Sequence, residues 1–213
     1  MTPINFQLRL EEEKDHRQVE ILTREAFWNL NFPGCGEHLV VHQLRKTKEF
    51  VRSLDFVAVY EGKIVGNIVY AEAKIKKPDQ DFTILTFGPV SVLPEYQNKG
   101  IGSKLINHTL KLAGEMNYKA IVIYGDPDYY RRFGFKSSKE YGITNKEKRF
   151  PAALLVLELY PGALKGIEGI FDEGKGYEIN EDESEIFDKQ FEAKEKKVTP
   201  TQEKFIKTVS QYL

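Results

Sequence analysis

The chain has 213 residues, 41% hydrophobic and 30% charged, which is the composition of a folded globular protein with a sizeable core. The formal net charge is −1, from 31 basic and 32 acidic residues, and this balance argues against nucleic-acid binding, because duplex binders carry a basic excess. The apolar runs are too short to cross a bilayer, and no signal peptide is expected. The single cysteine precludes an internal disulfide framework, so we expect a cytoplasmic protein.

Hydrophobic periodicity in the first 70 residues predicts two helices flanked by strands. The expected elements, in chain order, are a strand over residues 6–10, helices over 15–31 and 37–51, and a strand hairpin over 55–60 and 64–70. Phe6, Leu8 and Leu10 alternate with polar residues, as in a half-buried strand. Asp15 and Gln18 have the spacing of a capping pair at the start of the first helix.

The middle of the chain alternates between apolar strands and helical segments. The expected elements are a strand over residues 82–93, a helix over 100–117, a strand over 120–124, a short helical turn over 129–133 and a strand over 152–159. Gly88-Pro89 interrupts the first of these strands, and we expect a bulge or a splayed strand there because proline cannot donate to a sheet ladder. Asp126 is expected to cap the short helix, with Pro127 at its first position.

From about Pro161 the composition shifts toward glycine and charge, which indicates an appended, loosely packed extension. We therefore expect a domain over residues 1–160 and an extension over 161–213 that packs on the domain or on a partner subunit. Thr199 and Pro200 predict the start of a terminal helix that reaches residue 213. Its apolar stripe is expected to cover a sheet edge or to form a dimer contact, and the alternative is that the extension closes over the acceptor site.

The segment over residues 90–102 indicates chemistry most clearly. It has the pattern of an apolar strand, a tight turn and a glycine-containing loop that begins a long amphipathic helix. Gly100 and Gly102 let a ligand approach the backbone, and free amides at a helix N-terminus bind anions, above all phosphates. Asn98 and Lys99 favour a pyrophosphate further. A bare Gly-x-Gly also fits an ordinary strand-to-helix turn, and the residue order excludes the Rossmann and P-loop motifs.

In this context, Gln97-x-x-Gly100-x-Gly102 resembles the pyrophosphate loop of the GNAT acetyltransferases, Gln/Arg-x-x-Gly-x-Gly/Ala. The run from Tyr130 to Phe135 is similar to the Tyr-x-x-x-Gly-Phe segment that follows the fifth strand in that family. The order of strands, loop and helix also agrees over about residues 4–160. The resemblance implies an α/β (α+β) fold: a mixed, mostly antiparallel central sheet, splayed at the fourth strand, flanked by helices and followed here by a C-terminal extension.

The resemblance implies an acetyl-CoA-dependent N-acetyltransferase that acts on a primary amine of a small molecule or a protein, by direct attack in a ternary complex. Acetyl-CoA would be a cosubstrate, and no metal is expected. The residues expected to hold it are Val90, Ser91, Val92, Gln97, Asn98, Lys99, Gly100, Ile101, Gly102 and Ser103. A non-catalytic acyl-CoA-binding sensor or regulatory module is the alternative, because a fold can host either function. The acceptor, the acyl-chain length and homodimer formation stay open.

The resemblance also identifies candidate catalytic residues. Tyr130 is the candidate general acid for the departing CoA thiolate, because it has the spacing of the family motif, and the neighbouring Tyr129 is the alternative. A base is needed because an alkylamine is mostly protonated at pH 7. The candidates are Glu72, late in the hairpin, and Glu37, with His38 beside it. Each also fits an ordinary surface or capping role.

Overall fold

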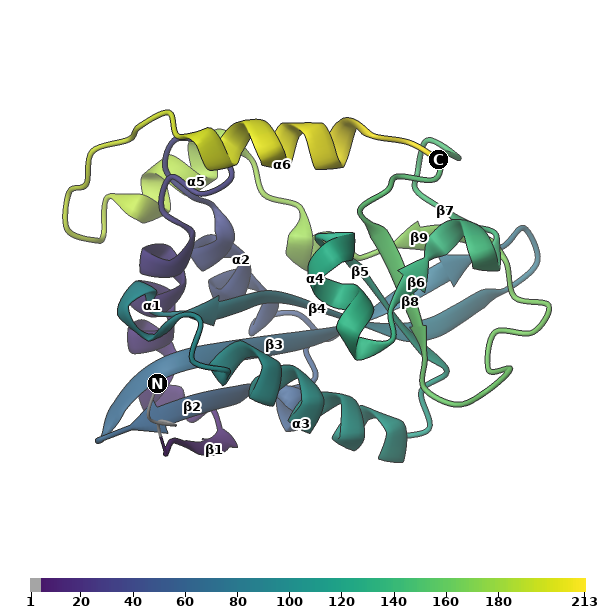
Figure 1. Ribbon diagram of the computed structural model, residues 1–213, viewed down its shortest axis with the longest axis horizontal. Coiled ribbons are helices and arrows are strands. Elements are labelled where there is room, and N and C mark those ends of the chain that lie inside the picture. Colours follow the sequence, from purple (N-terminus) through teal and green to yellow (C-terminus); the bar gives the residue numbers. More distant parts are fainter. Residues whose placement is uncertain (1–4) are drawn as a thin grey trace.

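The computed structural model describes residues 5–213, so the first four residues of the expected domain over 1–160 lie outside the described residues. The described chain forms a nine-stranded sheet flanked by helices (Figure 1). The strand order is β1 (Gln7–Leu10), β2 (Phe56–Tyr60), β3 (Lys63–Lys76), β4 (Asp81–Val92), β5 (Ala120–Tyr124), β8 (Leu154–Glu158) and β6 (Lys136–Ser137), while β9 (Gly169–Asp172) pairs with β3 and with β7 (Ile143–Thr144). The pairs are antiparallel except β4–β5 and the short β7–β9 pair, which confirms the expected mixed, mostly antiparallel sheet.

Two neighbouring positions on the paired strands β3 and β4 show which helices cover which face. The helices are α1 (His16–Phe27), α2 (Glu37–Leu44), α3 (Ile101–Glu115), α4 (Pro127–Tyr130), α5 (Glu181–Asp188) and α6 (Pro200–Ser210). A Cβ added at Gly66 of β3 would lie 2.8 Å from Ile101 of α3. Ser91, on the next cross-strand pair, instead donates a hydrogen bond to Thr23 of α1 at 3.0 Å. Successive strand residues point to opposite faces, so α3 covers one face and α1 with α2 the other.

The core lies between the sheet and these two helix layers, and its apolar side chains come from strands and helices alike. Tyr70 of β3 and Leu105 of α3 are among its fully buried members. Among residues 5–213, no helix is both long and apolar enough to span a membrane.

Strand β4 separates from β5, and this splay positions the site described below. The register of β3 against β4 shifts at Gly88 and Pro89, where the sequence predicts a bulge. On its other side, β4 pairs with β5 only at Leu85 and Ile121. Within the described chain, residues 86–92 therefore have no strand partner on the β5 side. The expected bulge and splay are confirmed, and their physical reason is that proline has no N–H for the ladder.

The first two helices differ from the prediction at their ends. Both end earlier than expected, α1 at Phe27 and α2 at Leu44. The expected capping pair of Asp15 and Gln18 does not form, since the Asp15 side chain makes no cap hydrogen bond to α1. The Asp15 carboxylate instead accepts two hydrogen bonds from the Arg9 guanidinium, at 2.5 and 3.0 Å. A charged partner on a neighbouring strand has replaced the local cap.

The segment after residue 160 is more deeply packed than its composition predicts. Its strand β9 extends the sheet by pairing with the far end of β3. Phe171 on β9 is 2% exposed, and Leu164 and Ile167 are buried in the same apolar cluster. The glycine- and charge-rich composition therefore predicted a loosely packed extension, whereas the segment contains a strand whose apolar residues join the core.

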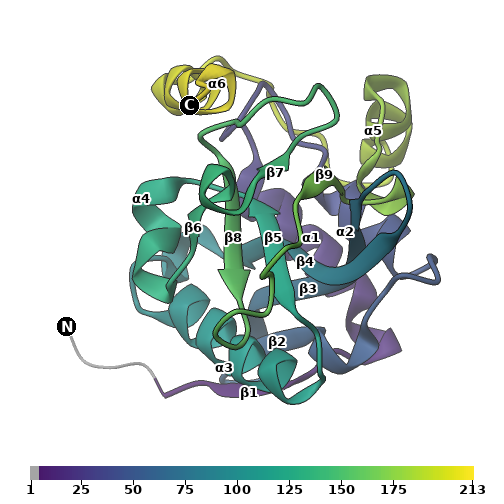
Figure 2. The same cartoon turned by 90° about the vertical axis from the view of Figure 1, so that its right-hand side faces the viewer.

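Helix α6 is tied to the rest of the molecule at both ends. It begins at Pro200, as expected, but ends at Ser210 rather than at residue 213. At its start, the Thr199 hydroxyl donates to the carbonyl of Asn29 at 2.7 Å rather than capping the helix. Beyond its end, the amide of Ala152 donates to the carbonyl of Gln211 at 2.8 Å. Figure 1 shows α6 lying across the molecule from the side of α1 and α2 to the loop before β8, and Figure 2 shows it nearly end-on.

Candidate active site

The loop between β4 and α3 presents a run of unpaired backbone amides. Asn98 and Gly100 adopt left-handed conformations, with φ of 60° and 83°, which direct successive N–H groups outward. The first hydrogen bond of α3 runs from the Lys104 amide to the Gly100 carbonyl at 3.0 Å. Within residues 5–213, the amides from Asn98 to Ser103 donate to no protein acceptor. Nothing lies within 4 Å of a Cβ placed at Gly100, so an anionic ligand has room to reach these amides.

The side chains of this loop are engaged elsewhere, which leaves the main chain as its binding surface. The Lys99 ammonium donates to the Glu95 carbonyl at 2.7 Å, and the Gln97 amide group donates to the Val92 carbonyl at 3.1 Å. The Ile101 side chain is buried in the core, at 1% exposure. The Ser91 hydroxyl is also engaged, because it donates to Thr23 of α1. At these expected cofactor positions the backbone groups, and not the side chains, are therefore free to bind a ligand.

A cavity of about 580 Å³ lies at the splay of β4. Its walls come from residues 86–90 of β4, from α1, α2 and α6, and from the end of β5. Val90 lines this cavity, and two residues later Val92 lies 3.7 Å from the position of a Gly102 Cβ. The free edge of β4 therefore runs from the cavity to the amide loop at the start of α3.

The two neighbouring tyrosines of α4 lie in different parts of this region. Tyr130 lines the cavity, and its ring packs so closely on Gly125 that an added Cβ there would lie 2.4 Å from the ring. The Tyr130 ring also contacts Phe87, with 5.9 Å between ring centroids, and burial raises the pKa of its phenol. The Tyr129 hydroxyl lies beside the amide loop, 3.3 Å from the position of a Gly102 Cβ. The structure thus brings Tyr130, and not Tyr129, to the cavity.

The two candidate bases lie on different faces of the sheet. Glu37, the first residue of α2, lines the cavity, where its carboxylate accepts hydrogen bonds from the Asn31 side chain at 2.8 Å and the Gly36 amide at 3.0 Å. Burial raises the pKa of Glu37. Glu72 does not line the cavity, because strand alternation directs it to the α3 face, where it accepts a hydrogen bond from the Tyr118 hydroxyl at 2.6 Å. This placement separates Glu72 from the cavity that Glu37 and Tyr130 line.

His38 lies next to Glu37 in the sequence but points away from the cavity. It is 0% exposed, with its ring against Phe187 and its Nε2 atom 3.3 Å from an Asp188 carboxylate oxygen. Burial lowers its pKa to about 4. Consecutive helical residues project about 100° apart, so α2 presents Glu37 to the cavity and His38 to the core. Across the described chain, no three His, Cys, Asp or Glu side chains gather as a metal site.

Glu173 is a cavity residue that no motif in the sequence indicated. It follows β9 directly and lines the cavity together with Tyr177. Burial raises the pKa of the Glu173 carboxyl. The Tyr177 hydroxyl is buried and forms no hydrogen bond to any described residue, although the Thr86 side chain lies beside it. Only the pairing of β9 with β3 brings this segment to the cavity, and its composition carries no signal of that pairing.

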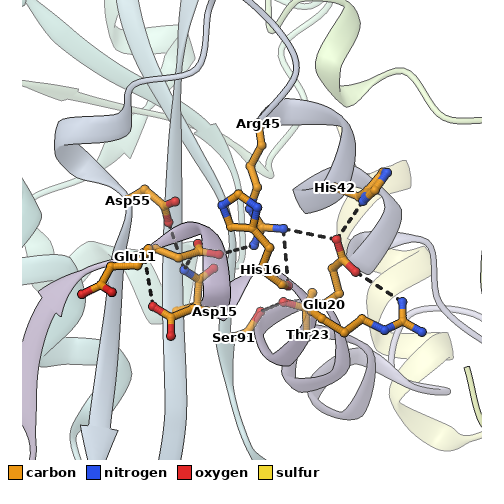
Figure 3. A network of polar contacts seen from close by, with 12 residues as sticks. Glu11, Asp15, His16, Glu20, Thr23, His42, Arg45, Asp55 and Ser91 are labelled. Carbon is orange, nitrogen blue, oxygen red and sulfur yellow. Dashed lines mark hydrogen bonds and ion pairs between the residues drawn. The ribbon is translucent and has the colours of Figure 1, made fainter.

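A buried polar network holds α1 and α2 against the sheet (Figure 3). Arg45, just after α2, donates to Glu11 at 2.5 Å and to Glu20 of α1 at 3.3 Å. Asn67 of β3 donates to the Asp55 carboxylate at 3.1 Å. Burial and the neighbouring Asp55 raise the pKa of Glu11. The network therefore fixes the two helices that form one wall of the cavity.

Comparisons with known proteins agree with this architecture. A family model described as an acetyltransferase (GNAT) domain matches residues 52–137. The uncharacterized N-acetyltransferase YhbS of Escherichia coli K12 is 26% identical over 166 residues, which cover 78% of this chain and 94% of that protein. YhbS in complex with CoA aligns with a TM-score of 0.72 and 23% identity, over 82% of this chain and 92% of that one. A GNAT family acetyltransferase from Brucella melitensis in complex with acetyl-CoA aligns with a TM-score of 0.65 and 26% identity, over 82% and 99%.

The segment matched by the family model contains both the amide loop and the Tyr130–Phe135 run, the two motifs that carried the resemblance. In sequence and in fold the chain is similar to the GNAT superfamily of acetyltransferases, which supports the expected family, and the expected fold is confirmed. Its chemistry is therefore acyl transfer.

Proposed function

We propose that this protein transfers the acetyl group of acetyl-CoA to a primary amine in a ternary complex. The observation that carries the proposal is the connection, along the free edge of β4, between six unpaired amides and a cavity that contains Tyr130 and Glu37. The aligned structures from E. coli and B. melitensis hold CoA and acetyl-CoA, which supports the same donor here.

The backbone of this chain fits the donor. The amides from Asn98 to Ser103 would bind the pyrophosphate, where the dipole of α3 adds to their attraction. The main chain of Val90 and Val92, unpaired on the β5 side, would bind the pantetheine arm. An amide on this edge would polarise the thioester carbonyl, since a fixed donor stabilises charge that develops on the oxygen. When bound, acetyl-CoA supplies an activated acetyl group.

The catalytic groups then move two protons. Glu37 takes one proton from the substrate ammonium, which frees the nitrogen lone pair to form the C–N bond at the thioester carbonyl carbon. As the C–S bond breaks, its electron pair goes to sulfur, and Tyr130 protonates that sulfur. Tyr130 then takes back the second proton from the newly acylated nitrogen. Overall, an ammonium ion and acetyl-CoA give an acetamide, CoA thiol and one proton held on Glu37.

The test is a calorimetric titration of acetyl-CoA into the wild-type protein and a Gly100→Glu variant. A glutamate at position 100 places a side chain and a negative charge where the pyrophosphate would bind, so we expect affinity to fall by at least about tenfold. Gly162→Glu is the matched control, because Gly162 has a similar φ of 75° and nothing within 4 Å of an added Cβ, and it lies outside the amide loop.

Loss of binding in Gly100→Glu but not in Gly162→Glu would support the donor site. Release of free thiol on addition of primary amines would then distinguish an enzyme from a non-catalytic acyl-CoA sensor. Absence of acetyl-CoA binding in the wild type, or equal binding in all three proteins, would contradict the proposal.

A further inference from the structure

The C-terminal segment forms the wall of the cavity that faces away from the sheet. Helix α6 contributes a single face to it, made of Thr201, Lys204, Phe205, Thr208 and Val209. The link after β9 contributes Glu173 and Tyr177. The residues that meet the acceptor therefore come in large part from outside the segment that the family model matches.

This wall is held in place, which limits the size of the acceptor. Besides the attachments at its two ends, α6 is tied near its middle by an ion pair between Lys204 and Asp126, 2.7 Å apart. Asp126 also caps α4, the helix that carries Tyr130, by accepting a hydrogen bond from the Asp128 amide at 2.9 Å. The cavity volume of about 580 Å³ lies within the range of small-molecule sites, roughly 300–1,000 Å³.

The charges that line the cavity favour a cationic ligand. Lys204 and Asp126 neutralise each other, which leaves Glu37 and Glu173 as the uncompensated charged groups of the lining. Lys146 is the cation that acts electrostatically on Glu173, but its ammonium group already pairs with Glu178 at 2.9 Å. Two half-buried carboxyl groups are unfavourable to ionise without a nearby cation, and a bound ammonium ion would offset that penalty.

The remaining walls favour an apolar ligand body. The apolar lining residues include Phe27, Leu30, Val40, Phe87, Phe205 and Val209. A chain with several charges would lose hydration against these apolar side chains. A ligand with one cationic end and an apolar remainder matches both kinds of wall.

We infer that the acceptor is a small primary amine with one cationic nitrogen and an apolar body, recognised by Glu37 and Glu173 and enclosed by α6. The inference rests on the proposed function for the role of this amine as acceptor. Glu173 acts here as a positioning residue that binds the ammonium group, while Glu37 takes the proton. Phe205 and Val209 contact the apolar body and so select against polar amines.

The experiment uses the full chain without acetyl-CoA and measures amine binding by calorimetry. The probes are 2-phenylethylamine, its neutral counterpart 2-phenylethanol, and butane-1,4-diamine, which has a second charge in place of the apolar end. We expect 2-phenylethylamine to bind at least about tenfold more tightly than either of the others. Equal binding of the amine and the alcohol, or tighter binding of the diamine, would overturn the inference using the wild type alone.

Two variants locate the binding groups. Glu173→Gln should weaken 2-phenylethylamine binding at least about tenfold, and Phe205→Ala should weaken it with little effect on the diamine. Glu203→Gln is the matched control, because Glu203 is an exposed residue of α6 that does not line the cavity. In turnover, Glu173→Gln should raise KM for the amine and leave kcat close to the wild-type value. Wild-type amine affinity in Glu173→Gln would overturn the role of Glu173.

Failure of this inference and failure of the proposed function give different results. Acetyl-CoA binding without 2-phenylethylamine binding would overturn the acceptor class and leave the transferase proposal standing. Amine binding that depends on Glu173, without acetyl-CoA binding, would support the amine site and contradict the transferase proposal.

Discussion

At the residue scale, the position of Tyr130 depends on a glycine. The Tyr130 ring occupies the space where a side chain at Gly125 would begin, 2.4 Å from the point that a Cβ would take, so only glycine at 125 permits this orientation. The same packing buries the phenol and raises its pKa above the ordinary value of 10. A phenol with a raised pKa stays protonated at neutral pH, as a proton donor must be.

Replacing Tyr130 by phenylalanine tests its role as general acid. We expect Tyr130→Phe to lower kcat by about 10²–10⁴-fold, because the departing thiolate loses its proton donor. Acetyl-CoA affinity should be unchanged, since the phenol acts only as the C–S bond breaks. Free-thiol release at saturating substrates measures the first quantity and calorimetry the second. Tyr129→Phe is the control and should retain turnover; a Tyr130→Phe variant with wild-type kcat would refute the assignment.

The pH dependence of turnover tests Glu37. Burial raises the pKa of Glu37 above its ordinary value of 4.5, so the fraction that can accept a proton increases as the pH rises through that raised value. The profile should therefore rise with pH and show no fall from Tyr130 below about pH 10. In Glu37→Gln this rising limb should disappear and kcat should decrease. Glu72→Gln is the control, because Glu72 lies on the other face; a profile altered by Glu72→Gln and unaffected by Glu37→Gln would reverse the assignment.

At the element scale, the close contact of β3 with α3 positions the amide loop. A Cβ at Gly66 would lie 2.8 Å from Ile101 and 3.2 Å from Leu105, so a glycine at this point lets the first turn of α3 approach the sheet. Ile101 begins α3, immediately after the last residue of the loop. Displacing this side chain therefore displaces the amides that would bind the pyrophosphate.

Gly66→Ala tests this contact. Overpacking against Ile101 should lower the free energy of unfolding by about 1–3 kcal/mol and weaken acetyl-CoA binding. Gly114→Ala is the matched control, because Gly114 also belongs to the β3–α3 unit but has nothing within 4 Å of an added Cβ, and it should raise stability by roughly 0.5–1 kcal/mol. Urea unfolding and calorimetry measure the two effects. Wild-type acetyl-CoA affinity in Gly66→Ala would show that the contact does not position the loop.

At the scale of the whole molecule, the splay of β4 joins two faces of the sheet. The amide loop lies at the start of α3, and the cavity takes its lining from both faces, with Glu37 from α2 and with Phe87 on the side of β4 that faces α3. The free edge of β4 runs between them. The C-terminal segment completes this arrangement, because β9 extends the sheet and α6, which lies across the molecule (Figure 1), lines the cavity.

Local features of the fold and site were predictable from the sequence. The strand over 120–124, the bulge at Gly88-Pro89 and the cap at Asp126 with Pro127 all appear as expected. The run of free amides from Asn98 to Ser103 was predictable too. Each depends on backbone preferences or hydrogen bonds within a few residues, so the neighbouring sequence is sufficient to determine it.

Long-range pairing determined the rest, because it sets which side chains share one space. Because side chains alternate along β3, Glu72 points toward α3. Because successive residues of α2 project in different directions, Glu37 lines the cavity and His38 does not. The pairing of β9 with β3 brought Glu173 to the cavity, and α6 closed it from outside. The sequence by itself therefore determined the family resemblance and the run of free amides, whose geometry is local, whereas only the tertiary structure decided which carboxylates line the cavity.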